Sequence, residues 1–237
     1  MTNVIILDTE TTGVDPQVDR LVELAGVPLH GGLRSQDFSV LVDPQRDIPP
    51  EAMAIHHITP RDVVGALDEV TAYLWMMKHF EDEELLAFCA HNAKFDKAFI
   101  DRITQGNLLL PWICTYKGAL TFFPEAPGHS NQVLRYWLNL EVDTPPGLFP
   151  HRALYDCYVT RELLKVLLKH GSVRDLVEIT QNPVLLRTVT FGKHKGKLWS
   201  EVDYGYLKWV LGPTGLTDNA DAIFTANHYI KRFKTKY

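Results

Sequence analysis

The chain has 237 residues, 46% of them hydrophobic and 22% charged, with a formal net charge of −5. This composition is typical of a folded protein with a sizeable core and excludes a disordered or fibrous chain. No apolar run reaches the length that spans a bilayer, and the N-terminus does not have the pattern of a signal peptide, so we expect a cytoplasmic protein. The 3 cysteines are too few and too scattered for a disulfide framework or a zinc site.

Charge is unevenly distributed along the chain. Residues 1–170 contain 14 Lys and Arg against 23 Asp and Glu, a net charge of −9, whereas residues 171–237 contain 10 against 6, a net charge of +4. A basic segment is expected where a protein contacts phosphate. A solvated, mildly basic surface explains the same numbers equally well, so charge alone leaves both interpretations open.

Apolar patterning predicts an α/β fold for the first 170 residues. Strands are expected at 4–7, 21–27, 38–42, 85–90 and 112–114, with a hairpin loop at Gly31-Gly32 between the second and the third. Helices are expected from Pro49-Pro50 onward and at 67–80, 93–103, 116–123, 131–138 and 152–168. In 67–80, helical spacing predicts that Leu67, Val70, Leu74 and Met77 form the buried face. Three strands followed by strands alternating with helices indicate a mixed sheet flanked by helices.

The sequence after Gly171 has a different pattern. Ser172 and Asp175 have capping-box spacing and predict the start of a short helix. Strands are expected at 188–191 and 197–199, around a Gly-Lys-rich turn, and helices at 206–211 and 220–233. We therefore expect two parts, a main domain at 1–170 and a small basic C-terminal region at 171–237.

Four carboxylates and one histidine lie in three short segments of the main domain. Asp8 and Glu10 end the first apolar run, and because strand side chains alternate, both emerge on the same face. Asp96 is expected in the first turn of a helix that follows a buried strand. His151 and Asp156 are about 140° apart on a regular helix, so they can face one site only if His151 precedes the helix.

Each of these segments has an ordinary explanation when taken alone. Two acids at a strand end can be solvated, Asp96 can serve the helix dipole, and a lone loop histidine is usually a surface residue. Buried together without a cation, the acids would repel one another. A divalent metal would remove that repulsion, and histidine is a common general base.

The combination resembles the three motifs of the DEDD superfamily of 3′–5′ exonucleases, in its histidine subgroup. The matching segments are Asp8-Thr9-Glu10, His91-Asn92-Ala93-Lys94-Phe95-Asp96, and His151 with Asp156. The sister subgroup carries tyrosine where this chain has Arg152. The resemblance extends along nearly the whole chain to one bacterial branch, through segments such as 53–59, 112–115, 144–148, 151–158 and 191–197.

This resemblance implies a ribonuclease H-like fold and two Mg²⁺ or Mn²⁺ ions held by Asp8, Glu10, Asp96 and Asp156. His151 would take the proton from the attacking water, and the product would be a nucleoside 5′-monophosphate. Candidates for contacts to the terminal nucleotide are Thr11, Thr12, Ile55, His56 and Asn92. The expected partner is DNA with a single- or double-stranded 3′ end, acted on in repair or end processing.

Lysines at 193, 195 and 197, between Gly192 and Gly196, predict a second contact with nucleic acid. Glycines let backbone N–H groups approach a phosphate, although a lysine-rich hairpin turn has the same sequence. The nearby aromatic residues can equally form a small core. Two other functions stay open: an RNA-trimming exonuclease with the same chemistry, and an exonuclease-fold subunit such as a proofreading partner of a polymerase.

Overall fold

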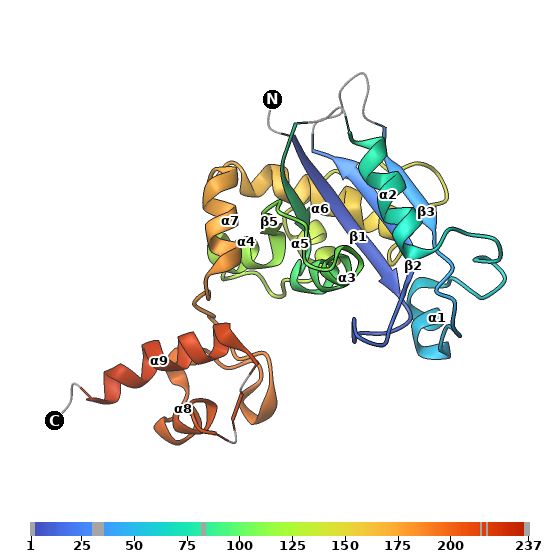
Figure 1. Ribbon diagram of the computed structural model, residues 1–237. Coiled ribbons are helices and arrows are strands. Elements are labelled where there is room, and N and C mark those ends of the chain that lie inside the picture. The colour runs from blue at the N-terminus through green and yellow to red at the C-terminus, as the bar shows by residue number, and fades with distance from the viewer. Residues whose placement is uncertain (1–2, 30–35, 82–83, 214, 217, 235–237) are drawn as a thin grey trace.

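The computed structural model describes residues 3–29, 36–81, 84–213, 215–216 and 218–234. Its centre is a five-stranded mixed sheet of order β3-β2-β1-β4-β5 (Figure 1). The strands are β1 (Asn3–Thr11), β2 (Leu21–Pro28), β3 (Phe38–Leu41), β4 (Leu85–Ala90) and β5 (Trp112–Cys114). β1, β2 and β3 pair antiparallel, whereas β1, β4 and β5 pair parallel. This confirms the mixed sheet, while the Gly31-Gly32 loop lies outside the described residues.

Helices cover both faces of the sheet. They are α1 (Pro50–His56), α2 (Glu69–His79), α3 (Lys94–Thr104), α4 (Thr115–Phe122), α5 (Asn131–Trp137), α6 (Ala153–Leu167), α7 (Val173–Gln181), α8 (Tyr204–Val210) and α9 (Ala220–Lys234). Alternation along β1 separates two cores: Val4 and Ile6 pack with α4 and α6, whereas Ile5 and Leu7 pack with α2 and α3. No helix among these is long and apolar enough to cross a bilayer.

The buried face expected for 67–80, which includes α2, is only partly confirmed: Leu67 and Met77 pack against the core as partly buried residues, but the other two do not. Val70 and Leu74 are 51% and 57% exposed, whereas Ala72, Tyr73 and Met76 are buried against the sheet. Aliphatic residues occur on both sides of this helix, so helical spacing alone selects more than one stripe. The aromatic ring of Tyr73 and the flexible Met76 fill the space above β2 and β1, and the sheet, not the helix, decides which stripe is buried.

The two strands expected in the C-terminal region are also wrong. Among the described residues of that region a single antiparallel bridge forms, between Thr188 and Leu198, and short 3-10 turns occupy Gly192–His194 and Trp199–Glu201. The capping box of α7 is confirmed, because Ser172 and Asp175 exchange the two expected hydrogen bonds. Helices α8 and α9 begin within two residues of their expected positions.

A separate small core holds residues 184–230 together. It is built around the fully buried Trp199, with Tyr206 and Leu207 of α8 and Ala226 of α9 packed against it. Leu176 of α7 belongs instead to the core of the sheet domain. The two parts are joined by Leu120 of α4, which packs into the small core. Two of the C-terminal aromatic residues, Trp199 and Tyr206, are therefore core residues.

Candidate active site

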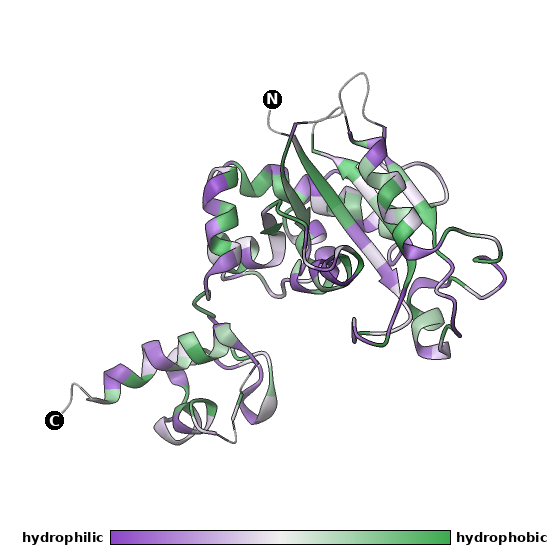
Figure 2. Cartoon of the chain, in the orientation of Figure 1, coloured by the Kyte–Doolittle hydropathy of each residue, from purple (hydrophilic) through white to green (hydrophobic). Residues whose placement is uncertain are grey.

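The end of β1 brings two acids out of an apolar strand. Val4 and Ile6 face α6, so Asp8 and Glu10, two and four residues further on, point to the same side. Figure 2 shows β1 changing from hydrophobic to hydrophilic along its length. The pairing with β2 shifts register between Glu10 and Thr11, which ends the regular ladder there. The strand therefore delivers both carboxylates to the edge of the core beside α6.

The start of α6 supplies the third acid. Residue 152 is the N-cap with extended backbone, and Asp156 lies in the first turn of the helix. His151 precedes the helix with a φ of 65°, an αL conformation uncommon for a non-glycine residue. Its backbone N–H donates to Asp156 Oδ2 over 2.9 Å. Because of this left-handed turn, His151 and Asp156 can face the same site although they are five positions apart. His151 itself is exposed.

Three of the four expected acids converge. Ligand oxygens of Asp8, Glu10 and Asp156 all lie within 4.8 Å of one another. Asp96 on α3 is 2% exposed and lies outside that group, held by the backbone N–H and hydroxyl of Thr9, at 3.0 and 2.8 Å. Its charge still acts on the cluster, because it raises the pKa of Asp8.

The acids are arranged at an electrostatic cost. Burial first, and then repulsion by the neighbouring carboxylates, raises the pKa of Glu10 to about 9 and that of Asp8 well above its usual range. Burial raises the pKa of Asp96 to about 7, against the opposing hydrogen bonds from Thr9. The pKa of Asp156 is raised for the same reason and is held down in part by the His151 N–H.

The site fits a divalent cation. In the part of the chain that the structure describes, none of Asp8, Glu10, Asp96 and Asp156 forms an ion pair with Lys, Arg or His. Clustered carboxylate oxygens are the donor set that hard cations such as Mg²⁺ prefer. Burial is the main cause of the raised pKa values, and repulsion between the carboxylates adds to it at Asp8 and Glu10. A bound cation would offset both, and Asp8, Glu10 and Asp156 could hold a metal ion.

A buried ion pair that the sequence reading missed braces this site. Glu23 of β2 lies opposite Glu10 in the sheet and is 2% exposed. Arg152 donates to it from Nε and Nη2 over 3.0 and 2.7 Å, and the Ala153 N–H donates over 3.0 Å. Arg152 also lowers the pKa of Glu10, although less than burial and the acids raise it. A charged residue inside the apolar run 21–27 was the available signal.

The five residues expected to contact a nucleotide lie in different surroundings. Ile55 is 53% exposed, and Asn92 is exposed with a φ of 62° just before α3. His56 is 1% exposed, its Nδ1 accepts from the Ile58 N–H, and its Nε2 has no partner among the described residues. Thr11 donates to the Gly13 carbonyl and Thr12 to Asp19, so both hydroxyls are engaged within their own loop.

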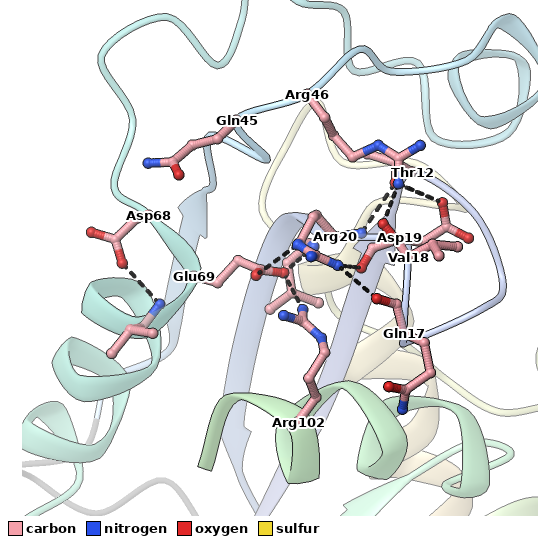
Figure 3. A network of polar contacts seen from close by, with 12 residues as sticks. Thr12, Gln17, Val18, Asp19, Arg20, Gln45, Arg46, Asp68, Glu69 and Arg102 are labelled. Carbon is pink, nitrogen blue, oxygen red and sulfur yellow. Dashed lines mark hydrogen bonds and ion pairs between the residues drawn. The ribbon is translucent and has the colours of Figure 1, made fainter. Parts of the chain in front are cut away.

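The loop after Glu10 is tied down by a polar network (Figure 3). Glu69 of α2 accepts from the Leu21 N–H over 2.7 Å and from Arg102 of α3 over 2.5 Å, and it also pairs with Arg20. Asp19 accepts from Thr12 at 3.0 Å and pairs with Arg46. These contacts join the segment 12–21 to two helices, so the chain that leaves the acidic cluster has a fixed path.

His91, the first residue of the second motif, is structural. Its Nε2 lies 2.8 Å from the His129 carbonyl and its Nδ1 lies 3.0 Å from the Thr115 hydroxyl. Burial lowers its pKa to about 4, so the imidazole is neutral at physiological pH and Nε2–H is the donor to His129. The ring thereby fixes the start of the turn that leads into α3 and Asp96.

The three lysines of the C-terminal turn are all exposed, and Gly192 and Gly196 have φ values of 63° and 88°. The N–H groups of residues 195, 196 and 197 donate to carbonyls within or beside the turn. A phosphate would therefore meet the lysine side chains and not these three amides. This result contradicts the expected backbone cradle at those positions, and it keeps the lysines available.

Comparisons with known proteins agree with this geometry. Residues 5–164 match the family described as exonuclease. The chain is 37% identical to exodeoxyribonuclease 10 of Escherichia coli K12 over 95% of its own length and 98% of the relative's. It is also 29% identical to the PolC-type DNA polymerase III of Thermotoga maritima, covering 88% of this chain but 16% of that protein.

The solved structures give the same result. A structure of exonuclease X in complex with 5′-overhanging duplex DNA is 35% identical, with a TM-score of 0.63, over 75% of this chain and 99% of that chain. E. coli exonuclease I with a dA16 oligonucleotide has a TM-score of 0.58 at 16% identity, over 77% and 44%, and shows the fold alone. The expected ribonuclease H-like fold and the resemblance to the bacterial exonuclease X branch are confirmed.

Proposed function

The chain belongs to the exonuclease family, and from this premise we propose that it is a metal-dependent 3′–5′ exodeoxyribonuclease that releases nucleoside 5′-monophosphates. The convergence of Asp8, Glu10 and Asp156 within 4.8 Å at the end of a buried strand is the main support. The 37% identity, over 95% of the chain, to a relative named as an exodeoxyribonuclease supports DNA as the substrate. A cytoplasmic role in DNA repair or end processing completes the proposal.

Asp8, Glu10, Asp96 and Asp156 are assigned as the ligands of two Mg²⁺ or Mn²⁺ ions. When bound, the ions supply positive charge that offsets both the carboxylates and the substrate phosphate. Thr9 fixes the orientation of Asp96 through two hydrogen bonds, which leaves the other carboxylate oxygen for a cation. Asp156 has the complementary role of anchoring the turn that carries His151.

His151 is assigned as the general base. Its side chain is exposed beside the acidic cluster, where it can accept a proton from the attacking water and release it to solvent. The hydrogen bond from its own N–H to Asp156 fixes the position of the backbone but leaves the imidazole free to turn. Ile55 and Asn92, both exposed, are assigned to the terminal nucleotide together with Thr11, Thr12 and His56.

A second candidate is proofreading as part of a polymerase, favoured by the similarity to PolC-type enzymes. A module of that kind acts on a 3′ end presented by its polymerase. The C-terminal region, which we propose as a separate nucleic-acid-contacting part at 171–237, favours an enzyme that grips DNA itself. RNA trimming would use the same acids and differ in how the pocket treats the 2′-hydroxyl.

Digestion of matched 3′-labelled single-stranded DNA, double-stranded DNA and RNA with Mg²⁺ tests the proposal, with Asp8→Ala in parallel. We expect release of mononucleotides from DNA and none in the variant, because the cluster loses a central carboxylate. Release from RNA alone would move the protein to RNA processing. A folded Asp8→Ala protein that cleaves at the wild-type rate would contradict the metal assignment.

A further inference from the structure

The solvent-facing side of α8 carries two large aromatic residues that its core does not use. Tyr206, Leu207 and Val210 are buried in the small C-terminal core. The opposite side of the helix presents Tyr204 and Trp209, which are 42% and 41% exposed. Figure 1 shows α8 in the C-terminal part, apart from the sheet.

Exposed glycine and lysine lie between the two rings. Successive residues of an α-helix are about 100° apart around its axis, which places Gly205 and Lys208 between Tyr204 and Trp209. Gly205 and Lys208 are both exposed. The small glycine leaves the space between the rings open. Lys208 Nζ lies 5.7 Å from the centre of the Tyr204 ring. The face therefore combines two aromatic edges with a cation in the middle.

Neighbouring elements extend this surface. Phe233 of α9 is 41% exposed, and its ring centre lies 5.5 Å from that of Tyr204. On the other side of α8, the ring centres of Trp209 and Tyr206 are 5.2 Å apart. Lys193 lies in the turn at 192–197, which we call the lysine turn, and its Nζ is 5.8 Å from the centre of the same Tyr206 ring. The buried Tyr206 ring therefore lies between Lys193 and Trp209 and contacts both, which places a cation of the lysine turn near the exposed face of α8.

The chemistry of this surface fits one ligand class. Aromatic rings accept bases by stacking whatever their sequence, and adjacent lysines meet the phosphates. Residues 171–237, which include this surface, have a net charge of +4 against −9 for residues 1–170, so without bound metal ions a polyanion is attracted more strongly to the C-terminal part than to the sheet domain. A protein partner of ordinary apolar character would not need Lys208 between the rings.

We propose that the exposed face of α8, with Tyr204, Lys208 and Trp209, is a binding surface on which unpaired bases of single-stranded DNA stack, with Lys193 contacting phosphate. The inference rests on the proposed function, because it supplies a holding site for the strand that the sheet domain shortens. It gives the aromatic residues of α8 a role that is separate from the acidic site. Loss of these residues should therefore lower the affinity for single-stranded DNA and leave the rate of phosphodiester hydrolysis unchanged.

The test measures binding of a fluorescein-labelled oligothymidylate by fluorescence anisotropy, with the full chain in EDTA so that no cleavage occurs. The variant Tyr204→Ala/Trp209→Ala is compared with Trp75→Ala, which removes a 56% exposed tryptophan from α2 in the sheet domain. We expect affinity to fall roughly 5-fold or more for each aromatic residue lost from α8, and no change for Trp75→Ala. Hydrolysis of the p-nitrophenyl ester of thymidine 5′-monophosphate with Mg²⁺ should be unchanged in both.

A second measurement does not depend on the double variant. Trp209 fluorescence should be quenched by oligothymidylate in the wild type, and Trp209→Phe should lose that quenching while keeping most of the affinity. If the wild type cleaves DNA and Tyr204→Ala/Trp209→Ala binds oligothymidylate as tightly as the wild type does, the binding surface on α8 would be refuted and the exonuclease proposal would stand. An equal loss of affinity in Trp75→Ala would also refute the binding surface. A wild type that neither binds nor cleaves DNA would instead refute the proposed function.

Discussion

The buried pair between Glu23 and Arg152 offers the sharpest test of how the site is held. Arg152→Met keeps much of the side-chain volume but removes the guanidinium, so Glu23, at 2% exposure, keeps only the Ala153 N–H as partner. Removing one member of a buried pair costs about 3–5 kcal/mol. Because the Arg152 side chain is 27% exposed, we expect the lower end, about 3 kcal/mol.

The same change should reduce activity. The pair holds the first turn of α6, and with it Asp156 and the His151 N–H, against β2. A displacement of about 1 Å at reacting groups can cost ~100-fold in rate, so we expect a loss of roughly 10- to 100-fold in kcat, with a smaller change in KM. The substrate contacts that we propose for Ile55 and Asn92 are left in place, which is why kcat should carry most of the effect.

Urea unfolding of wild type, Arg152→Met and Glu23→Gln/Arg152→Met at pH 7.5, with exonuclease assays on each, measures both effects. The midpoint should fall by about 1 M or more in the single variant. The double variant should recover much of that stability, since no uncompensated charge stays buried, but not the activity. An Arg152→Met protein with wild-type midpoint and wild-type rate would refute the reasoning, and so would a double variant less stable than the single one.

Three further predictions concern the base, the acids and the lysine turn. His151→Ala should lower the cleavage rate by about 10²–10⁴ with little change in the unfolding midpoint, and an unchanged rate would remove it as general base. Because the folded pKa of Glu10 is raised to about 9 from its usual 4.5, the metal-free protein should lose stability as pH rises through that window. Urea unfolding in EDTA should show this slope reduced in Glu10→Gln, and a slope identical to wild type would contradict the burial argument. Replacing Lys193, Lys195 and Lys197 with Gln should weaken DNA binding most at low salt and flatten the dependence of log K on log salt, and an unchanged slope would exclude phosphate contact.

Much of the site could be predicted from the sequence because it rests on local rules. Alternation along an apolar strand places Asp8 and Glu10 on one face without knowledge of the partner strands. A buried strand followed at once by a helix places Asp96 at its first turn. The spacing of His151 and Asp156 requires His151 to lie before the helix, and the αL turn at His151 meets that requirement.

Other features depended on contacts between distant segments. Val70 and Leu74 were wrongly expected in the buried stripe of α2, because two apolar stripes satisfy the helical period and only packing on the sheet selects Tyr73 and Met76. The strands at 188–191 and 197–199 were mispredicted because β-branched and aromatic residues favour strands, yet one bridge and a buried Trp199 are what the small core accommodates.

The sequence by itself determined the family, the mixed sheet and the identity of the acids, because strand alternation and motif spacing are properties of neighbouring residues. The tertiary structure alone decided which charges neutralise one another. Glu23 and Arg152 are 129 positions apart, and nothing local indicates that they meet. Likewise Thr9 orients Asp96 across 87 positions. Electrostatic interactions act through space and not along the chain. The raised pKa values of the acidic cluster and the ion pair between Glu23 and Arg152 therefore arise only when β1, β2, α3 and α6 are brought together.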